Sequence, residues 1–172
     1  MASLEVLLTE EQIQDKVAEL ARQIAADYGD TPLLLVGVLK GSLMFLADLA
    51  RHLGDNIEID FVQTSSYGDG TASSGIVQIR KDLDVSIEGR DVLIVEDILD
   101  TGRTLSHLRE LLGTRRPKSL KVVTLLRKPE AARHEAQAEY VGFDIPARFV
   151  VGYGLDQAER YRNLSYVAVL LQ

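Results

Sequence analysis

Apolar residues recur at helical spacing between residues 10 and 28. Thr9 stands just before this stretch and Gln12 three residues further on, which is the arrangement of a capping box at a helix start. Gly29 and Asp30 follow as a stop signal. The pattern therefore predicts a helix over 10–28. The apolar positions that define it are Ile13, Val17, Leu20 and Ile24.

Two shorter runs, 33–39 and 91–95, are almost wholly apolar and contain β-branched residues, which is typical of strands buried on both faces of a sheet. Helical and strand-like segments alternate around them. This alternation predicts an α/β fold with a mostly parallel twisted sheet flanked by helices. Further helices are predicted over 42–53 and 104–112, and further strands over 57–63, 76–80, 119–126, 149–151 and 166–171.

Residues 65–74 break the alternation, because Ser, Tyr, Gly, Asp and Thr follow one another there without an apolar period. Such a stretch predicts a mobile loop. Strands that look antiparallel flank it, and they indicate a small hood subdomain on the main sheet. The length of 172 residues is that of one ordinary domain, so we expect a single domain over 1–172.

Composition and charge narrow the class of protein. The chain has no cysteine, which excludes disulfides and thiolate metal sites. A net charge of −7 disfavours nucleic acid as the main partner. It allows a small phosphorylated substrate, because carboxylates can hold a divalent cation that neutralises phosphate charge. A basic and apolar leader is missing, as is an apolar run of about 20 residues, so we expect a cytoplasmic protein without a membrane partner.

Residues 92–104, which read VLIVEDILDTGRT, carry the most specific chemistry. A buried strand would deliver Glu96 and Asp97 to its carboxyl end, where open α/β sheets bind ligands. The helix that follows would offer free N–H groups to an anion. Gly102 allows close approach to a phosphate, and two threonines add hydroxyl donors. A capped helix beside solvated acids would look similar, but two acids shortly before Asp-Thr-Gly-x-Thr favour a phosphate site.

This segment resembles the phosphoribosyl pyrophosphate-binding motif of type I phosphoribosyltransferases. From about residue 8 to 170 the chain is similar to a short, bacterial-like form of the hypoxanthine-guanine phosphoribosyltransferase branch. The resemblance implies that Glu96 and Asp97 handle the ribose hydroxyls and nearby magnesium. It implies that Asp100 is the catalytic general base at purine N7. The implied phosphoribosyl and 5′-phosphate site consists of Glu96, Asp97, Asp100, Thr101, Gly102, Arg103 and Thr104.

Lys40 and Gly41 follow the first buried strand, where a point charge beside an exposed N–H suits pyrophosphate. An ordinary strand exit would have the same residues. The resemblance assigns this Leu-Lys-Gly loop to pyrophosphate, together with Arg162. Members of the family often have a cis peptide between Lys and Gly, and the sequence leaves open whether Lys40–Gly41 is cis.

Ser66 and Tyr67 lie in the predicted loop, at about 65–75. By themselves they are typical of a solvated surface loop. In the family the matching loop closes over the active site, which would keep water from the reacting ribose. The resemblance therefore implies a mobile active-site loop here.

The purine site is implied by residues near the end of the chain. Lys128 stands just past a predicted strand end, where any solvated lysine could stand, and the resemblance assigns it to the purine 6-oxo group. An ammonium is only a donor, so it suits a 6-oxo group and rejects the 6-amino group of adenine. The resemblance places Phe149 against the purine ring, Val150 at the base edge and Asp156 at a second magnesium. It thus implies a purine-binding hood from about 128–172 plus the N-terminal segment.

The resemblance implies purine salvage by a magnesium-dependent enzyme. Hypoxanthine or guanine would react with phosphoribosyl pyrophosphate to give IMP or GMP and pyrophosphate, in a homodimer or homotetramer. One alternative is a regulator of the same fold that binds RNA, which the acidic charge and the pairing of Lys128 with Phe149 disfavour. Another is an enzyme for xanthine or a pyrimidine. His52, His107 and His134 match no motif and indicate surface or capping roles.

Overall fold

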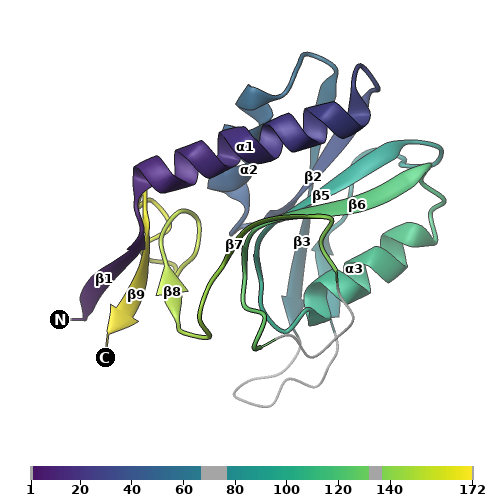
Figure 1. Ribbon diagram of the computed structural model, residues 1–172. Helices are drawn as coiled ribbons and strands as arrows, with labels where there is room; N and C mark the ends of the chain where they lie inside the picture. The colour runs from purple at the N-terminus through teal and green to yellow at the C-terminus, as the bar shows by residue number, and fades with distance from the viewer. Residues whose placement is uncertain (1, 67–76, 132–136, 172) are drawn as a thin grey trace.

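The computed structural model describes residues 2–66, 77–131 and 137–171, and these form two sheets and three helices (Figure 1). The elements along the chain are β1 (Ser3–Leu8), α1 (Glu10–Tyr28), β2 (Leu33–Leu39), α2 (Leu43–His52), β3 (Ile57–Ser66), β4 (Val77–Lys81), β5 (Asp91–Leu99), α3 (Arg103–Gly113), β6 (Ser119–Arg127), β7 (Tyr140–Asp144), β8 (Val150–Val151) and β9 (Val167–Leu171).

The larger sheet has the strand order β4-β3-β2-β5-β6-β7. All neighbouring strands in it are parallel except β3 and β4, which confirms the mostly parallel sheet. From β2 the chain continues to β3, towards the β4 edge of the sheet. From β5 it continues to β6, towards the opposite, β7 edge. The order of winding therefore reverses between β2 and β5. In open α/β sheets a ligand crevice lies at the carboxyl ends of the strands at such a reversal.

Helices cover both faces of this sheet, as Figure 1 shows for α1 and α2 on one side and α3 on the other. The strands supply alternate residues to the two sides. Leu33 and Leu35 pack in the hydrophobic cluster that contains α1 and α2, whereas Leu34 and Val36 pack in the cluster of α3. This alternation confirms that β2 is buried on both faces, and explains why its sequence is apolar throughout.

The smaller sheet is antiparallel and has the order β1-β9-β8, so both ends of the chain lie in it (Figure 1). The strands beside the 65–74 loop, β3 and β4, belong to the main sheet, so the small subdomain is formed by the two ends of the chain and not by those strands. Leu8, Val150 and Val167 belong to the same hydrophobic cluster as the buried face of α1. The small sheet is therefore packed against the main one through a shared core. Its proposed extent over 128–172 stays a prediction.

Local signals predicted some element ends well and others badly. The capping box of Thr9 and Gln12 is present, and α1 has the predicted bounds. β1 and β7 were not predicted. The loop expected from Ser65 is wrong at its start, because Ser65 and Ser66 extend β3 by pairing with β4. The rest of that loop, 67–74, lies outside the described residues.

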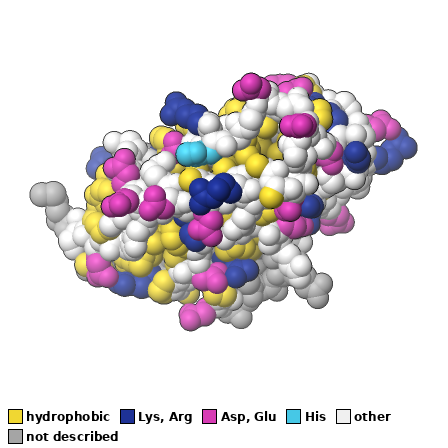
Figure 2. Space-filling model, turned by 45° about the horizontal axis from the view of Figure 1, so that its top comes forward, with side chains coloured by type: hydrophobic (Ala, Val, Ile, Leu, Met, Phe, Trp, Pro, Cys, Tyr) yellow, Lys and Arg dark blue, Asp and Glu magenta, His cyan; other side chains and the backbone are white. Residues whose placement is uncertain are grey.

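The surface seen from above α1 mixes charges of both signs with hydrophobic side chains between them (Figure 2). No continuous basic patch is visible among the described residues on this face, in keeping with the net charge of −7. Within 2–66, 77–131 and 137–171, none of the helices is long and apolar enough to span a bilayer.

Candidate active site

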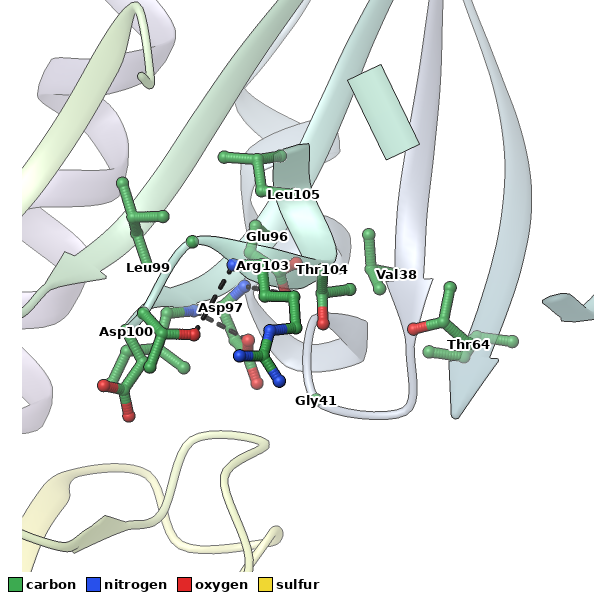
Figure 3. Close-up of a pocket in the computed structure, with 14 residues that line it drawn as sticks. Val38, Gly41, Thr64, Glu96, Asp97, Leu99, Asp100, Arg103, Thr104 and Leu105 are labelled. Carbon is green, nitrogen blue, oxygen red and sulfur yellow. Dashed lines mark hydrogen bonds between the residues drawn. The ribbon is translucent and has the colours of Figure 1, made fainter. Parts of the chain in front are cut away.

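A cavity of about 290 Å³ opens where β2 and β5 end, at the reversal of winding (Figure 3). Its wall includes every residue from 96 to 105, together with Val38, Leu39 and Gly41 from the end of β2 and Thr64 from β3. The structure thus brings together the acids, the turn and the helix start that the sequence singled out. Glu96, Asp97 and Asp100 to Thr104 line one cavity.

The helix start in this cavity is suited to an anion. Gly102 precedes α3 in the left-handed conformation, with φ 87°. Gly102, at the N-cap, has no side chain to cap the helix, and the first turn of α3 holds no acid. Thr101 lies at the turn, where its hydroxyl oxygen accepts from the N–H of Arg103 at 3.4 Å. The positive end of the α3 dipole therefore faces a cavity lined with hydroxyl groups.

Two adjacent carboxylates lie deeper, near the end of β5. Glu96 is buried, and its Oε1 accepts from the N–H of Asp97 at 3.2 Å. Burial and then the neighbouring Asp97 carboxylate raise the pKa of Glu96 well above its usual value. Burial likewise raises the pKa of Asp97. The pair is therefore poorly compensated in the protein alone.

These two carboxylates fit a hard divalent cation such as Mg²⁺, which prefers oxygen ligands and uses one or two carboxylates beside substrate phosphates and water. No group of three or more His, Cys, Asp or Glu suited to a metal occurs in the described part of the chain. Asp156, the third predicted metal ligand, instead pairs with Arg162 at 3.3 Å. The structure does not bring Asp156 into one cluster with Glu96 and Asp97.

Gly41 is held between two other segments. A Cβ atom on Gly41 would lie 1.8 Å from Oδ2 of Asp97, and one on Gly154 would lie 2.1 Å from the carbonyl oxygen of Gly41. Only glycine fits at Gly41, and Gly154 also has φ 97°. The cis peptide of this loop is Leu39–Lys40, one bond earlier than the position considered from the sequence.

Lys128 and Asp100 form an ion pair at the edge of the cavity, with Nζ 3.2 Å from Oδ2. Lys128 is largely buried, whereas the side chain of Asp100 is 49% exposed. Asp100 directly follows β5 and Lys128 directly follows β6, and these two strands are neighbours in the sheet. The N–H of Lys128 donates to the carbonyl of Leu99 at 2.9 Å. The predicted general base and the predicted purine-reading lysine are therefore in direct contact.

Lys40 and Arg162, the predicted pyrophosphate ligands, are linked through a residue that the sequence did not single out. Nζ of Lys40 lies 2.9 Å from Oε2 of Glu159, and a terminal nitrogen of Arg162 lies 3.3 Å from Oε1. Arg162 also donates to the carbonyl of Gly154 at 2.7 Å. The two cations therefore share one carboxylate.

Other predicted residues lie elsewhere. Phe149 precedes β8 and is 54% exposed, and neither it nor the buried Val150 lines the cavity. Ser66 ends β3. Tyr67 lies outside the described residues, so its role in a closing loop stays a prediction.

Thr64, Gly154 and Glu159 are the residues of this region that sequence reasoning missed. Thr64 follows an ordinary strand pattern, and its position beside the cavity depends on the sheet. Glu159 lies three residues before Arg162, but its other partner is 119 residues away along the chain. No local signal connects positions so far apart.

Comparison with known proteins agrees with this geometry. Residues 3–158 match the family model of the phosphoribosyl transferase domain. A hypoxanthine-guanine phosphoribosyltransferase of Bacillus subtilis is 56% identical over 165 residues, which are 96% of this chain and 92% of that protein. A crystal structure of a hypoxanthine phosphoribosyltransferase from Staphylococcus aureus has a TM-score of 0.93 and 54% identity, covering 96% of this chain and 90% of that one. A Trypanosoma cruzi hypoxanthine phosphoribosyl transferase has a TM-score of 0.90 and 48% identity, covering 96% and 90%.

The chain belongs to the phosphoribosyltransferase family, as the fold, the cavity and the family model together establish. Within that family it falls in the hypoxanthine-guanine branch, and it is a transferase of purine salvage.

Proposed function

We propose that this enzyme transfers the 5-phosphoribosyl group from phosphoribosyl pyrophosphate to hypoxanthine or guanine, forming IMP or GMP and pyrophosphate. The observation that carries this proposal is the ion pair between Lys128 and Asp100, in which Asp100 lines the same cavity as the helix start of α3. One side of the site suits a phosphate, and the other presents a donor next to an acceptor.

The donor and acceptor match one edge of a 6-oxopurine. O6 and N7 lie side by side on that edge, with O6 an acceptor and N7 able to carry a proton. The ammonium of Lys128 can only donate, so it can bind O6, while the carboxylate of Asp100 can accept the proton of N7. In the absence of a base the two side chains satisfy each other. Adenine would present its 6-amino donor to Lys128, which leaves that ammonium without an acceptor.

The phosphates have separate sites in this proposal. The 5′-phosphate binds at the start of α3, where Thr101, Gly102 and Thr104 surround it. Pyrophosphate binds beside Gly41, with Lys40 and Arg162 as its cations. Phe149 is exposed and can stack on the base, with Val150 beside its edge.

In the reaction the bond from ribose C1 to the pyrophosphate oxygen breaks as the bond from C1 to purine N9 forms. Asp100 takes the N7 proton, so positive charge does not build up on the base. Lys40 and Arg162 stabilise the charge that develops on the leaving pyrophosphate. No covalent bond to the protein is needed.

Magnesium is part of this proposal, with Glu96 and Asp97 as its principal protein ligands and Asp156 as a ligand of a second ion. It would supply positive charge next to the ribose hydroxyls and the pyrophosphate oxygens. The raised pKa values of Glu96 and Asp97 support this assignment, because a bound cation would relieve the burial of both charges.

We further propose a single domain over 1–172 that works in the cytoplasm as a homodimer or homotetramer. The support for assembly comes from the relative of Trypanosoma cruzi, whose C-terminal region was studied for its role in oligomeric state and activity. Sedimentation velocity of the purified chain tests this point directly.

The decisive test is a panel of bases. The protein is incubated with phosphoribosyl pyrophosphate, magnesium and hypoxanthine, guanine, xanthine, adenine or uracil, and the nucleotide formed is measured. We expect product from hypoxanthine or guanine, little from adenine, and none after chelation with EDTA. Turnover of xanthine or uracil alone would contradict the base assignment. Absence of any product, with a salt-dependent shift of RNA in a gel, would favour a regulator.

A further inference from the structure

A tight turn presents Glu159 to the two cations of the proposed pyrophosphate site. Gln157 and Arg160 exchange two backbone hydrogen bonds, of 3.1 and 3.0 Å, around the central pair Ala158 and Glu159. Both central residues have positive φ, 49° and 67°. Two-residue turns of this kind favour Asn and Gly, so this chain keeps a glutamate in an unfavourable backbone region.

The carboxylate of Glu159 bridges cations from distant parts of the chain. Oε2 lies 2.9 Å from Nζ of Lys40, and Oε1 lies 3.3 Å from a terminal nitrogen of Arg162. Lys40 and then Arg162 lower the pKa of Glu159, so it stays ionised. The side chain is nevertheless 63% exposed. An anion held in this way by exposed contacts can leave easily.

Arg162 does not depend on Glu159 for its position. It donates to the carbonyl of Gly154 at 2.7 Å and pairs with Asp156 at 3.3 Å. Its buried Nε has no hydrogen-bond partner among the described residues. Glu159 therefore satisfies the guanidinium only in part.

We propose that Glu159 is a displaceable internal anion that occupies Lys40 and Arg162 before pyrophosphate binds and returns to them after it leaves. The inference rests on the proposed function, because it takes these two cations as the pyrophosphate ligands. Glu159 is a positioning residue, since it acts through Lys40 and Arg162. Its competition weakens the binding of pyrophosphate and of the pyrophosphate group of the substrate, and assists release of the product.

The test is direct binding of pyrophosphate, in the presence of magnesium, measured by isothermal titration calorimetry on the full chain. Glu159→Gln keeps the shape of the side chain and removes its charge. Exposed ion pairs of this kind change an equilibrium by about two- to fivefold each, so we expect pyrophosphate to bind about three- to tenfold more tightly. The advantage shrinks at high salt, because exposed charges are screened.

Glu88→Gln is the matched control, because Glu88 is also 63% exposed and pairs with a single arginine away from the cavity. Its affinity for pyrophosphate should equal that of the unmodified protein. Glu159→Gly is the second variant, since glycine accepts the positive φ and removes the carboxylate without strain. It should also bind pyrophosphate more tightly, and lower the KM for phosphoribosyl pyrophosphate without raising kcat.

Equal or weaker binding in both Glu159 variants would overturn the inference and indicate that Glu159 only orders the turn. That result leaves the proposed function standing if the unmodified protein binds pyrophosphate and converts hypoxanthine or guanine. Failure of the unmodified protein in both of those assays would overturn the proposed function and, with it, the inference.

Discussion

Two carboxylates of the main sheet are buried to nearly the same degree but have opposite surroundings. Asp60 in β3 is 5% exposed and Glu96 in β5 is 7% exposed. Asp60 accepts from the N–H groups of Asp84 and Val85 at 2.9 and 3.2 Å, and Lys81 lies 3.8 Å away. Asp60 therefore holds the loop after β4 to the sheet.

Glu96 accepts from the N–H of its neighbour Asp97 at 3.2 Å, and burial together with the negative charge of Asp97 raises the pKa of Glu96. The difference shows what marks a functional acid in this fold. Burial is shared by both residues, whereas of these two acids Glu96, which lines the cavity, is the one with a strongly raised pKa. A group that stays poorly paired in the protein is available to a substrate or cation.

Asp100→Asn, in the proposed active site, should have the largest effect of the changes considered, and this effect should be on turnover. The amide cannot take the N7 proton, so we expect kcat to fall by about 10²- to 10⁴-fold, with little change in the affinity for phosphoribosyl pyrophosphate. Steady-state kinetics with hypoxanthine and a binding titration measure the two quantities. Equal kcat in both proteins would remove Asp100 as the general base.

Asp60→Ala should have the largest effect on stability. It leaves the N–H groups of Phe61, Asp84 and Val85 without this acceptor. We expect the free energy of unfolding to fall by about 3 kcal/mol. The corresponding fall in Tm is about 6–12 °C, measured by calorimetry. Asp60→Asn keeps an acceptor and should lose less. A large loss of kcat in folded Asp60→Asn would contradict the view that Asp60 is structural and Glu96 functional.

Glu96→Gln should act in the opposite direction on stability. Removing a buried, poorly paired charge should raise the free energy of unfolding by about 1 kcal/mol in protein without substrate or magnesium. We expect activity to fall at least about tenfold, because the cation and ribose lose a ligand. Thermal melts and turnover measure both, with Glu110→Gln on the surface of α3 as the control. A destabilised Glu96→Gln would show that Glu96 is structural.

Glu139 is a carboxylate that is less buried than Asp60 and Glu96 but is paired within the protein. Its replacement should show the smallest effect of the changes considered. Burial alone would raise its pKa, but Arg109 and the N–H of Val122, at 2.7 Å, outweigh burial and lower it. Its stabilising contribution is therefore present above the unfolded pKa of about 4.3 and is lost as pH falls through the lower folded pKa. Urea unfolding of Glu139→Gln should show a loss of about 1 kcal/mol at pH 7 that narrows below pH 4. A constant difference across this range would refute the linkage.

Much of the fold was predictable because its signals are local. The capping box of Thr9 fixes the start of α1, and the apolar run 33–39 identifies β2. β1 and β7 were missed because each needs a distant partner. Ser3–Leu8 pairs with the end of the chain, and Tyr140–Asp144 pairs with β6. A short strand of mixed character acquires its conformation from the ladder it joins.

The residues of the candidate site were likewise predictable where they are neighbours along the chain, and not where they come from distant segments. Glu96 to Thr104 are contiguous, so the spacing of acids, glycine and threonine along one strand–turn–helix unit could be recognised as a phosphate site. Lys40 was suggested by its place after a buried strand, where an ordinary strand exit would have the same residues, and Arg162 was assigned by resemblance only. Glu159 was not assigned at all, because its contacts join segments 119 residues apart.

The sequence by itself therefore determined the class of fold, the family and the segment proposed to bind phosphate, because each is encoded in apolar periods and in residues that are close neighbours along the chain. The tertiary structure alone decided which acid is compensated and which is not, how Gly41 is enclosed by Asp97 and Gly154, and which carboxylate pairs with both Lys40 and Arg162. The physical reason is that burial, pairing and close backbone approach depend on strand order and on segments that meet only after folding.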